Sequence, residues 1–106
     1  MKVREVIENL DNLKGNSVDD GLKYRWIGEV EGRVICEIHG EDAEKITVSV
    51  SEESELSVPD AYAGVYTFYL LAMLEYAEGN YSGYDTMKKE YEAAFNSYAK
   101  YVIRKR

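Results

Sequence analysis

The chain has 106 residues, and its 45% hydrophobic content suffices for a packed core and excludes disorder of the whole chain. We therefore expect a single domain over residues 1–106. Twenty Asp and Glu residues against 13 Lys and Arg residues give a net charge of −7. This balance argues against a nucleic-acid binder, because such binding draws on clustered basic side chains. It is typical either of a surface that lets DNA pass without adhering or of an ordinary soluble protein.

Cysteine usage and hydropathy further narrow the class of protein to which the chain can belong. Cys36 is the only cysteine, so we expect no intramolecular disulfide and no cysteine-rich metal site. The amphipathic first residues lack the apolar stretch of a signal peptide. No run approaches the ~18 apolar residues that cross a membrane. We therefore expect synthesis and folding in the cytosol, without membrane contact.

Two amphipathic helices are predicted in the first part of the chain. The first has apolar residues at helical spacing and ends at Gly15: Val3, Val6, Ile7, Leu10 and Leu13. The second spans residues 18–39, with apolar residues every four positions: Leu22, Trp26, Val30, Val34 and Ile38. Gly28, Gly32 and Cys36 form a second ridge of small side chains. Each glycine costs a helix about 1 kcal/mol relative to alanine, so the ridge indicates either a close backbone approach or a locally weak helix.

A change of period marks residues 40–59. Val48 and Val50 alternate with polar residues, as does Ile46, and Leu56 and Val58 alternate again after a predicted turn. We predict one short β-hairpin or extended arm around residues 45–58, resting on the helices or on another subunit. The segment is also acidic, with only Lys45 opposing six carboxylates: Glu41, Asp42, Glu44, Glu52, Glu53 and Glu55.

Two further helices follow Pro59, which favours a helix start just after it. The third is apolar on nearly all sides, because Phe68, Leu71 and Leu74 lie outside its main apolar stripe. Such a helix is either central to the fold or faces another subunit as well. The fourth has a stripe at alternating spacings of three and four: Tyr84, Met87, Tyr91, Ala94, Tyr98 and Tyr101. The predicted fold is therefore mainly α, with about four helices in a small bundle and a C-terminal antiparallel helical hairpin.

The sequence contains few signals of catalysis, metal binding or cofactor binding. His39 is predicted at a helix end, where the helix dipole favours it, and no motif supplies it with a nucleophile. The glycines form no phosphate-binding loop, and no zinc spacing is present. We therefore expect no enzyme, no metal and no cofactor. Most of the ten tyrosines lie between residues 62 and 101, and they indicate a core with its hydroxyls at the rim, a protein interface, or a stacking platform for nucleic acid.

Two stretches match recognisable patterns. Residues 26–33, WIGEVEGR, match W-[LI]-x-x-[LV]-[DE]-G-R. Residues 58–62 match V-P-x-x-Y, and residues 69–76 match Y-L-x-A-x-x-[DE]-Y. The chain thus resembles the head–tail connector family, adaptor or head-completion proteins of tailed phages and Gram-positive prophages. Residues 40–56 carry no firm match.

The resemblance implies a structural virion protein of the phage neck, made in the bacterial host cytoplasm. Such subunits form a ring, commonly of about twelve copies, between the portal protein and a stopper or tail-completion protein. The candidate subunit or portal interface comprises Phe68, Leu71, Leu74, Ile46, Val48, Val50, Arg104, Lys105 and Arg106. The candidate channel-facing carboxylates are the six of the acidic segment. Sequence-specific nucleic-acid binding is not expected. The alternative is a small acidic helical interaction or regulatory module of phage or host origin.

Overall fold

The structure, a computed structural model, describes residues 1–42 and 48–106. The candidate residues Ile46 and Glu44, and Lys45 between them, lie outside the described residues. The described elements follow in chain order: α1 (Val3–Leu13), α2 (Asp20–Arg33), the π-helical turn η1 (Val34–Ile38), the 3₁₀ turn η3 (Asp60–Tyr62), α3 (Gly64–Ala77) and α4 (Tyr81–Lys105).

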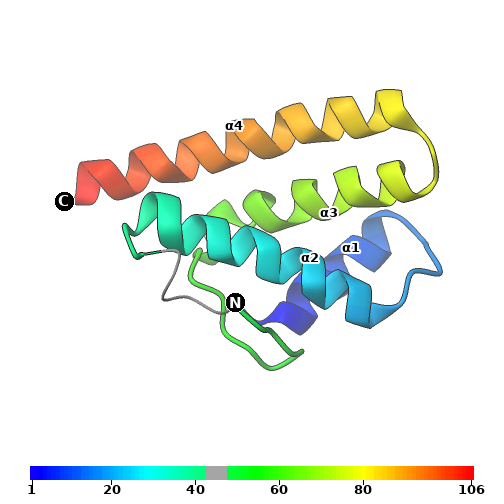
Figure 1. Cartoon of the computed structure of the whole chain (residues 1–106), viewed down its shortest axis with the longest axis horizontal. Coiled ribbons are helices and arrows are strands. Elements are labelled where there is room, and N and C mark those ends of the chain that lie inside the picture. Colours follow the sequence, from blue (N-terminus) through cyan, green and yellow to red (C-terminus); the bar gives the residue numbers. More distant parts are fainter. Residues whose placement is uncertain (43–47) are drawn as a thin grey trace.

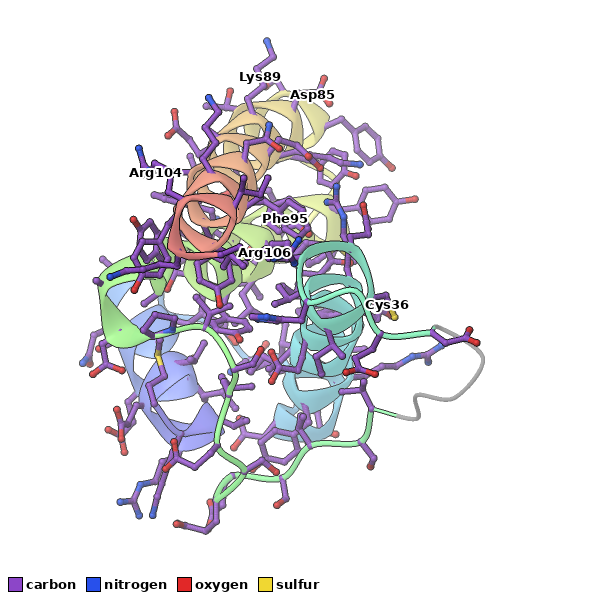
Figure 2. The ribbon with its side chains drawn as sticks, turned by 90° about the vertical axis from the view of Figure 1, so that its left-hand side faces the viewer. Cys36, Asp85, Lys89, Phe95, Arg104 and Arg106 are labelled. Carbon is purple, nitrogen blue, oxygen red and sulfur yellow. The ribbon has the colours of Figure 1, made fainter. Side chains whose placement is uncertain are left out.

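Helix α3 lies at the centre of the bundle, and α4 runs antiparallel along it (Figure 1). Figure 2 shows α1 and α2 on opposite sides of α3, beneath α4. The predicted fold class, a small helical bundle with a C-terminal helical hairpin, is confirmed. Within the part of the chain that the structure describes, no helix is both long and apolar enough to span a membrane.

The turn between α3 and α4 is short because both helix ends are capped locally. Gly79 ends α3 in the left-handed region, at a φ of 79°, which glycine adopts without steric cost. The side chain of Asn80 then accepts a hydrogen bond of 3.1 Å from the amide of Gly83 in the first turn of α4. Antiparallel packing brings the rings of Tyr69 and Tyr91 to 5.0 Å between centroids. The predicted antiparallel helical hairpin is therefore present.

The core fills the space that α1, α2 and α4 enclose around α3. Its largest fully buried side chains come from every helix except α4, and from the segment before η3: Tyr66, Leu10, Ile27, Leu70, Leu74, Val3, Val6, Val30, Val34, Val58 and Val65. Helix α4 adds Tyr91, Phe95 and Tyr98. The apolar ridge of α2 is buried as predicted, except for Leu22 in the first turn, which is 38% exposed.

The segment before η3 is extended, and its described residues form no hairpin. Among residues 1–42 and 48–106, the only β-type pairing is the isolated bridge between Lys2 and Glu55. Helix α1 has no side-chain cap, and its first amide groups bond instead to carbonyl oxygens of this segment. Val3 donates to Ser54 at 3.1 Å, and Arg4 donates to Glu52 at 3.0 Å. The predicted turn at residues 51–54 is present, because the Ser54 amide donates to the carbonyl oxygen of Ser51 at 3.0 Å. The first amides of α1 supply the donors that a hairpin partner would otherwise supply.

The glycine ridge of α2 permits a close approach. A Cβ atom on Gly28 would lie 3.3 Å from the carbonyl oxygen of Val48, and one on Gly32 would lie 3.4 Å from its Cγ2 atom. Of the two alternatives left open by the sequence, a close backbone approach is the one that the structure contains. The extended segment rests against α2 at these positions.

Candidate protein–protein interface

The residues with catalytic or metal-binding potential are dispersed or occupied by structural contacts. The Nε2 atom of His39 lies 3.1 Å from the hydroxyl of Tyr98, so the histidine joins the end of η1 to α4. Cys36 lies on the outer side of the same turn (Figure 2). Among the residues that the structure describes, no group of three His, Cys, Asp or Glu side chains is placed to hold a metal ion.

A buried carboxylate network connects α2, α3 and the extended segment. Glu31 is 6% exposed and accepts hydrogen bonds from the Tyr66 hydroxyl at 2.6 Å and from the Ser57 hydroxyl at 2.9 Å. The Ser57 amide also donates to Glu31 at 2.8 Å, and the Val58 amide donates to the Tyr66 hydroxyl at 3.2 Å. Burial and the bond to Glu31 raise the pKa of Tyr66 far above its usual value. The network anchors the segment before η3 to the bundle.

Sequence reasoning missed Glu31, although a signal was present. Glu31 lies four residues after Ile27 and three before Val34, both of which are buried, so helical spacing places it on the apolar face. A carboxylate in such a position needs donors, because burying an unsatisfied charge is costly.

Arg33 joins α2 to α4 in a second polar contact. Its guanidinium carbon lies 3.9 Å from the centroid of the Phe95 ring. The guanidinium also donates to Glu37, to Glu92 and to the Tyr91 hydroxyl, at 2.7 to 3.1 Å. Burial opposes its charge, but these bonds outweigh burial and raise the pKa of Arg33. The residue therefore holds two helices together and remains charged.

One side of α3 stays partly uncovered between α1 and α4. Phe68 and Leu71 are both partly exposed there. The Phe68 ring folds over Gly64, whose position also lies next to the Cβ atom of Ala94 on α4. Leu71 lies one turn before Glu75, which pairs with Lys14 just beyond α1. We call this surface, made by Phe68, Leu71 and Ala94, the α3 side.

Leu74 does not belong to this surface. Its exposure is 0%, so its prediction as an interface residue is wrong for the folded monomer. The reason is that α3 is apolar on nearly all sides, and its position between α1, α2 and α4 decides which apolar residues are covered.

A groove lies on the opposite side of the bundle, along the outer face of α2. It is a hollow of about 600 Å³ whose lining includes α2 and the extended segment: Gly21, Tyr24, Arg25, Gly28, Glu29, Gly32, Val48, Ser49 and Val50. Val48 and Val50, two predicted interface residues, are partly exposed in it. We call this surface the α2 groove.

The predicted acidic residues do not act as one group. Glu53 binds Lys2 at 2.7 Å and Arg4 at 2.9 Å, and the bond from Lys2 lowers the pKa of Glu53. The carboxylate of Glu55 pairs with the N-terminal ammonium of Met1 at 3.3 Å, and Glu44 lies outside the described residues. The exposed members of the set also include Glu41, Asp42 and Glu52.

The three basic residues at the end of α4 also differ in their environments. Arg104 and Lys105 are exposed, and Lys105 lies 5.7 Å from the ring of Tyr101. Arg106 turns back toward α2 and donates to the carbonyl oxygen of Ile38 at 2.6 Å, in the position visible in Figure 2. This last side chain therefore caps the end of η1.

The tyrosines serve several environments. Tyr66, Tyr91 and Tyr98 are buried, which agrees with a core whose hydroxyls find partners. Tyr76 and Tyr81 are 54% and 63% exposed at the turn between α3 and α4, with their rings 5.7 Å apart.

No protein family, curated protein or solved structure matches the chain in comparisons of sequence and fold.

Proposed function

We propose that this protein is a subunit of an oligomeric ring in the neck of a tailed phage, between the portal protein and a stopper or tail-completion protein. The resemblance of residues 26–33 and 58–76 to neck connectors motivates the proposal. The observation that carries it is the α3 side, where Phe68 and Leu71 remain partly exposed although α3 is packed on its other sides. A single subunit does not fully cover its central helix, and a neighbouring copy would do so.

The charge of the protein suits a ring through which DNA passes. The net charge is −7, and Glu41 and Glu52 are exposed. Carboxylates repel the phosphate backbone, so a channel lined by them does not retain the DNA.

The direct test is incubation of the purified protein with DNA-filled, tail-less capsids of the phage that encodes it. Electron microscopy of the portal vertex should reveal an added ring of density that is absent from untreated capsids. The same images would supply the number of subunits. A folded protein that leaves the portal vertex unchanged would refute the neck role.

Leu71→Asp tests the surface that carries the proposal. The variant should fold as a monomer, because Leu71 is only partly buried, and it should fail to form the ring. Leu74→Asp is the matched control on the same helix, three residues later. It should unfold, since an unpaired charge would replace a fully buried side chain at a cost of several kcal/mol. Circular dichroism separates the two outcomes, and an unfolded Leu71→Asp would assign Leu71 to the core.

A second function is supported by an acidic hollow between α1 and α2. Its described lining consists of Arg4, Ile7 and Tyr24 together with four carboxylates, Glu8, Asp11, Asp20 and Glu52. Lys23 already pairs with Asp11 at 2.9 Å and with Asp20 at 3.6 Å, which leaves Glu8 and Glu52 to face a basic partner. Burial raises the pKa of Tyr24, with further contributions from Glu52 and Asp20. Such a surface suits a basic partner, as expected for a regulatory module with no place in a virion. Mass spectrometry of purified virions separates the two functions, because only the connector stays in the finished particle.

A further inference from the structure

Helix α4 differs from the rest of the chain in its charge. It carries five of the 13 basic residues but only three of the 20 acidic ones. None of these acidic residues follows Glu92, whereas Lys100, Arg104 and Lys105 all do. The net charge of −7 is therefore unevenly distributed, and one helix of this acidic protein is basic.

One side of α4 bears a stripe of exposed residues without a carboxylate. Its members follow each other at helical spacings of three and four, so they lie on one side of the helix: Lys89, Ala93, Asn96, Lys100 and Arg104. We call them the α4 stripe. Figure 2 views α4 nearly end-on and shows Lys89 and Arg104 on its outer side, away from α1 and α2. At about 1.5 Å per residue, the stripe is about 22 Å long.

The three cations of the α4 stripe have no partner within the described chain. The side chains of Lys89, Lys100 and Arg104 form no ion pair or hydrogen bond with residues 1–42 or 48–106. Compensation of the helix dipole accounts only for basic residues in the last turn, and Lys89 and Lys100 lie before that turn. Their charges therefore remain open to an anionic partner.

Carboxylates border the α4 stripe and do not interrupt it. Asp85 lies one turn before Lys89, and Glu90 lies on one flank of the stripe. On the other flank, Glu92 accepts a hydrogen bond from Arg33 at 3.1 Å. An anion that lies along the stripe therefore meets cations and neutral side chains.

We infer that the α4 stripe binds the phosphate backbone of duplex DNA. Lysine, arginine and asparagine side chains are among the common donors to DNA phosphates, and such contacts need no particular base sequence. One strand of a duplex presents a phosphate every ~3.4 Å along the axis, so a charged stripe of about 22 Å spans several of them. A carboxylate-rich protein offers negative charge without this regular spacing. The choice of DNA as the polyanion rests on the proposed neck function, which brings DNA past every subunit.

The small number of cations limits how tightly each subunit holds DNA. Three cations allow about three phosphate contacts, so the binding is weak and depends strongly on the salt concentration. The opposite side of the molecule, where α1 and α2 form the acidic hollow, repels the same phosphates (Figure 2). DNA is thereby positioned along α4 and remains free to slide past.

Fluorescence anisotropy of a short labelled duplex, titrated with the purified unmodified protein, tests the inference. Binding should occur at low salt with duplexes of unrelated sequence. The logarithm of the association constant should fall linearly with the logarithm of the salt concentration, with a slope of about −2.7 for three phosphate contacts. Removing two of the cations, in Lys100→Gln with Arg104→Gln, should reduce this slope to about −0.9 and weaken the binding about tenfold or more.

Lys88→Gln with Lys105→Gln is the matched control. It removes the same charge from exposed positions of the same helix that lie outside the α4 stripe, so the slope should stay near that of the unmodified protein. All four substituted side chains are exposed, so both double variants should keep the helical circular dichroism of the unmodified protein. An equal loss of affinity in the two variants would show that total charge, and not the stripe, binds DNA, and would overturn the inference.

Two other results would overturn the inference. One is a duplex that does not bind at low salt. The other is displacement of the duplex by poly-L-glutamate at an equal concentration of charges, which would assign the stripe to a carboxylate-rich protein.

Images of the portal vertex test the neck function separately from the DNA contact. An added ring of density, together with no binding of the duplex, leaves the neck function in place and refutes the DNA contact. Binding of the duplex through the α4 stripe, with the portal vertex unchanged, supports the DNA contact and refutes the neck function.

Discussion

Replacing Tyr66 with phenylalanine removes one hydroxyl from the buried network and leaves the ring in place. The hydroxyl is a donor to Glu31 at 2.6 Å and an acceptor from the Val58 amide at 3.2 Å. A hydrogen bond to a charged group contributes about 1.5–3 kcal/mol, and a buried amide without a partner costs about 1–3 kcal/mol. Because Ser57 still donates twice to Glu31, we expect a total loss near the lower part of that sum, about 3 kcal/mol.

Urea unfolding followed through the single tryptophan measures this loss. Trp26 is 5% exposed in the folded chain, so its fluorescence reports the transition. With a urea m-value of about 1.5 kcal/mol/M, a loss of ~3 kcal/mol lowers the midpoint by about 2 M. A loss of ~3 kcal/mol is a large share of the 5–15 kcal/mol that stabilises a typical domain.

Tyr69→Phe is the matched control for Tyr66→Phe. It removes a hydroxyl from the same helix, but that hydroxyl donates to Glu29, whose side chain is 47% exposed. Water replaces the lost bond there, and we expect a cost of about 0.5–1 kcal/mol. If Tyr66→Phe costs no more than Tyr69→Phe, the buried network does not contribute as the distances imply.

Two other predictions concern the contacts of the extended segment. Gly32→Ala should stabilise the chain by up to about 1 kcal/mol through helix propensity, because among the described residues the added Cβ meets side-chain atoms of Val48, Cγ2 at 3.4 Å and Cβ at 4.0 Å. Gly28→Ala should gain less, since its Cβ meets a backbone oxygen at 3.3 Å; equal midpoints in urea for the two variants would contradict this contact. Glu53 should titrate below its ordinary pKa of 4.5 in NMR, because Lys2 favours its charged form, so its stabilising contribution is present above pH 4.5 and is lost as the pH falls through the lowered pKa. Lys2→Ala should move that pKa back toward 4.5, and a titration unaffected by the substitution would exclude the ion pair as its cause.

The helices could be predicted because their signals are local. Apolar spacing of three and four residues places Tyr91 and Tyr98 on one face of α4, and both are buried against the bundle. Gly79 and Asn80 could likewise be identified as a turn from their backbone preferences alone. These features depend on a few consecutive residues, so they can be predicted without knowledge of the rest of the fold.

The extended segment could be predicted only in part. Alternation indicated that Leu56 and Val58 share a buried face, and both are buried. It did not indicate that Val3 and Arg4 would supply the hydrogen-bond donors, since a β-type edge accepts any backbone that arrives with unpaired amides. The partner was decided by where the start of α1 lies in the bundle.

The candidate interface shows most clearly where local reasoning ends. Composition and periodicity determined that this chain is acidic and mainly helical, with a central helix that is apolar on nearly all sides. They could not separate Leu71 from Leu74, or show that Glu31 would find three donors, because coverage of a side chain depends on what packs over it. Helical phase is set by neighbours along the chain, whereas exposure and satisfied charge are set by neighbours in space.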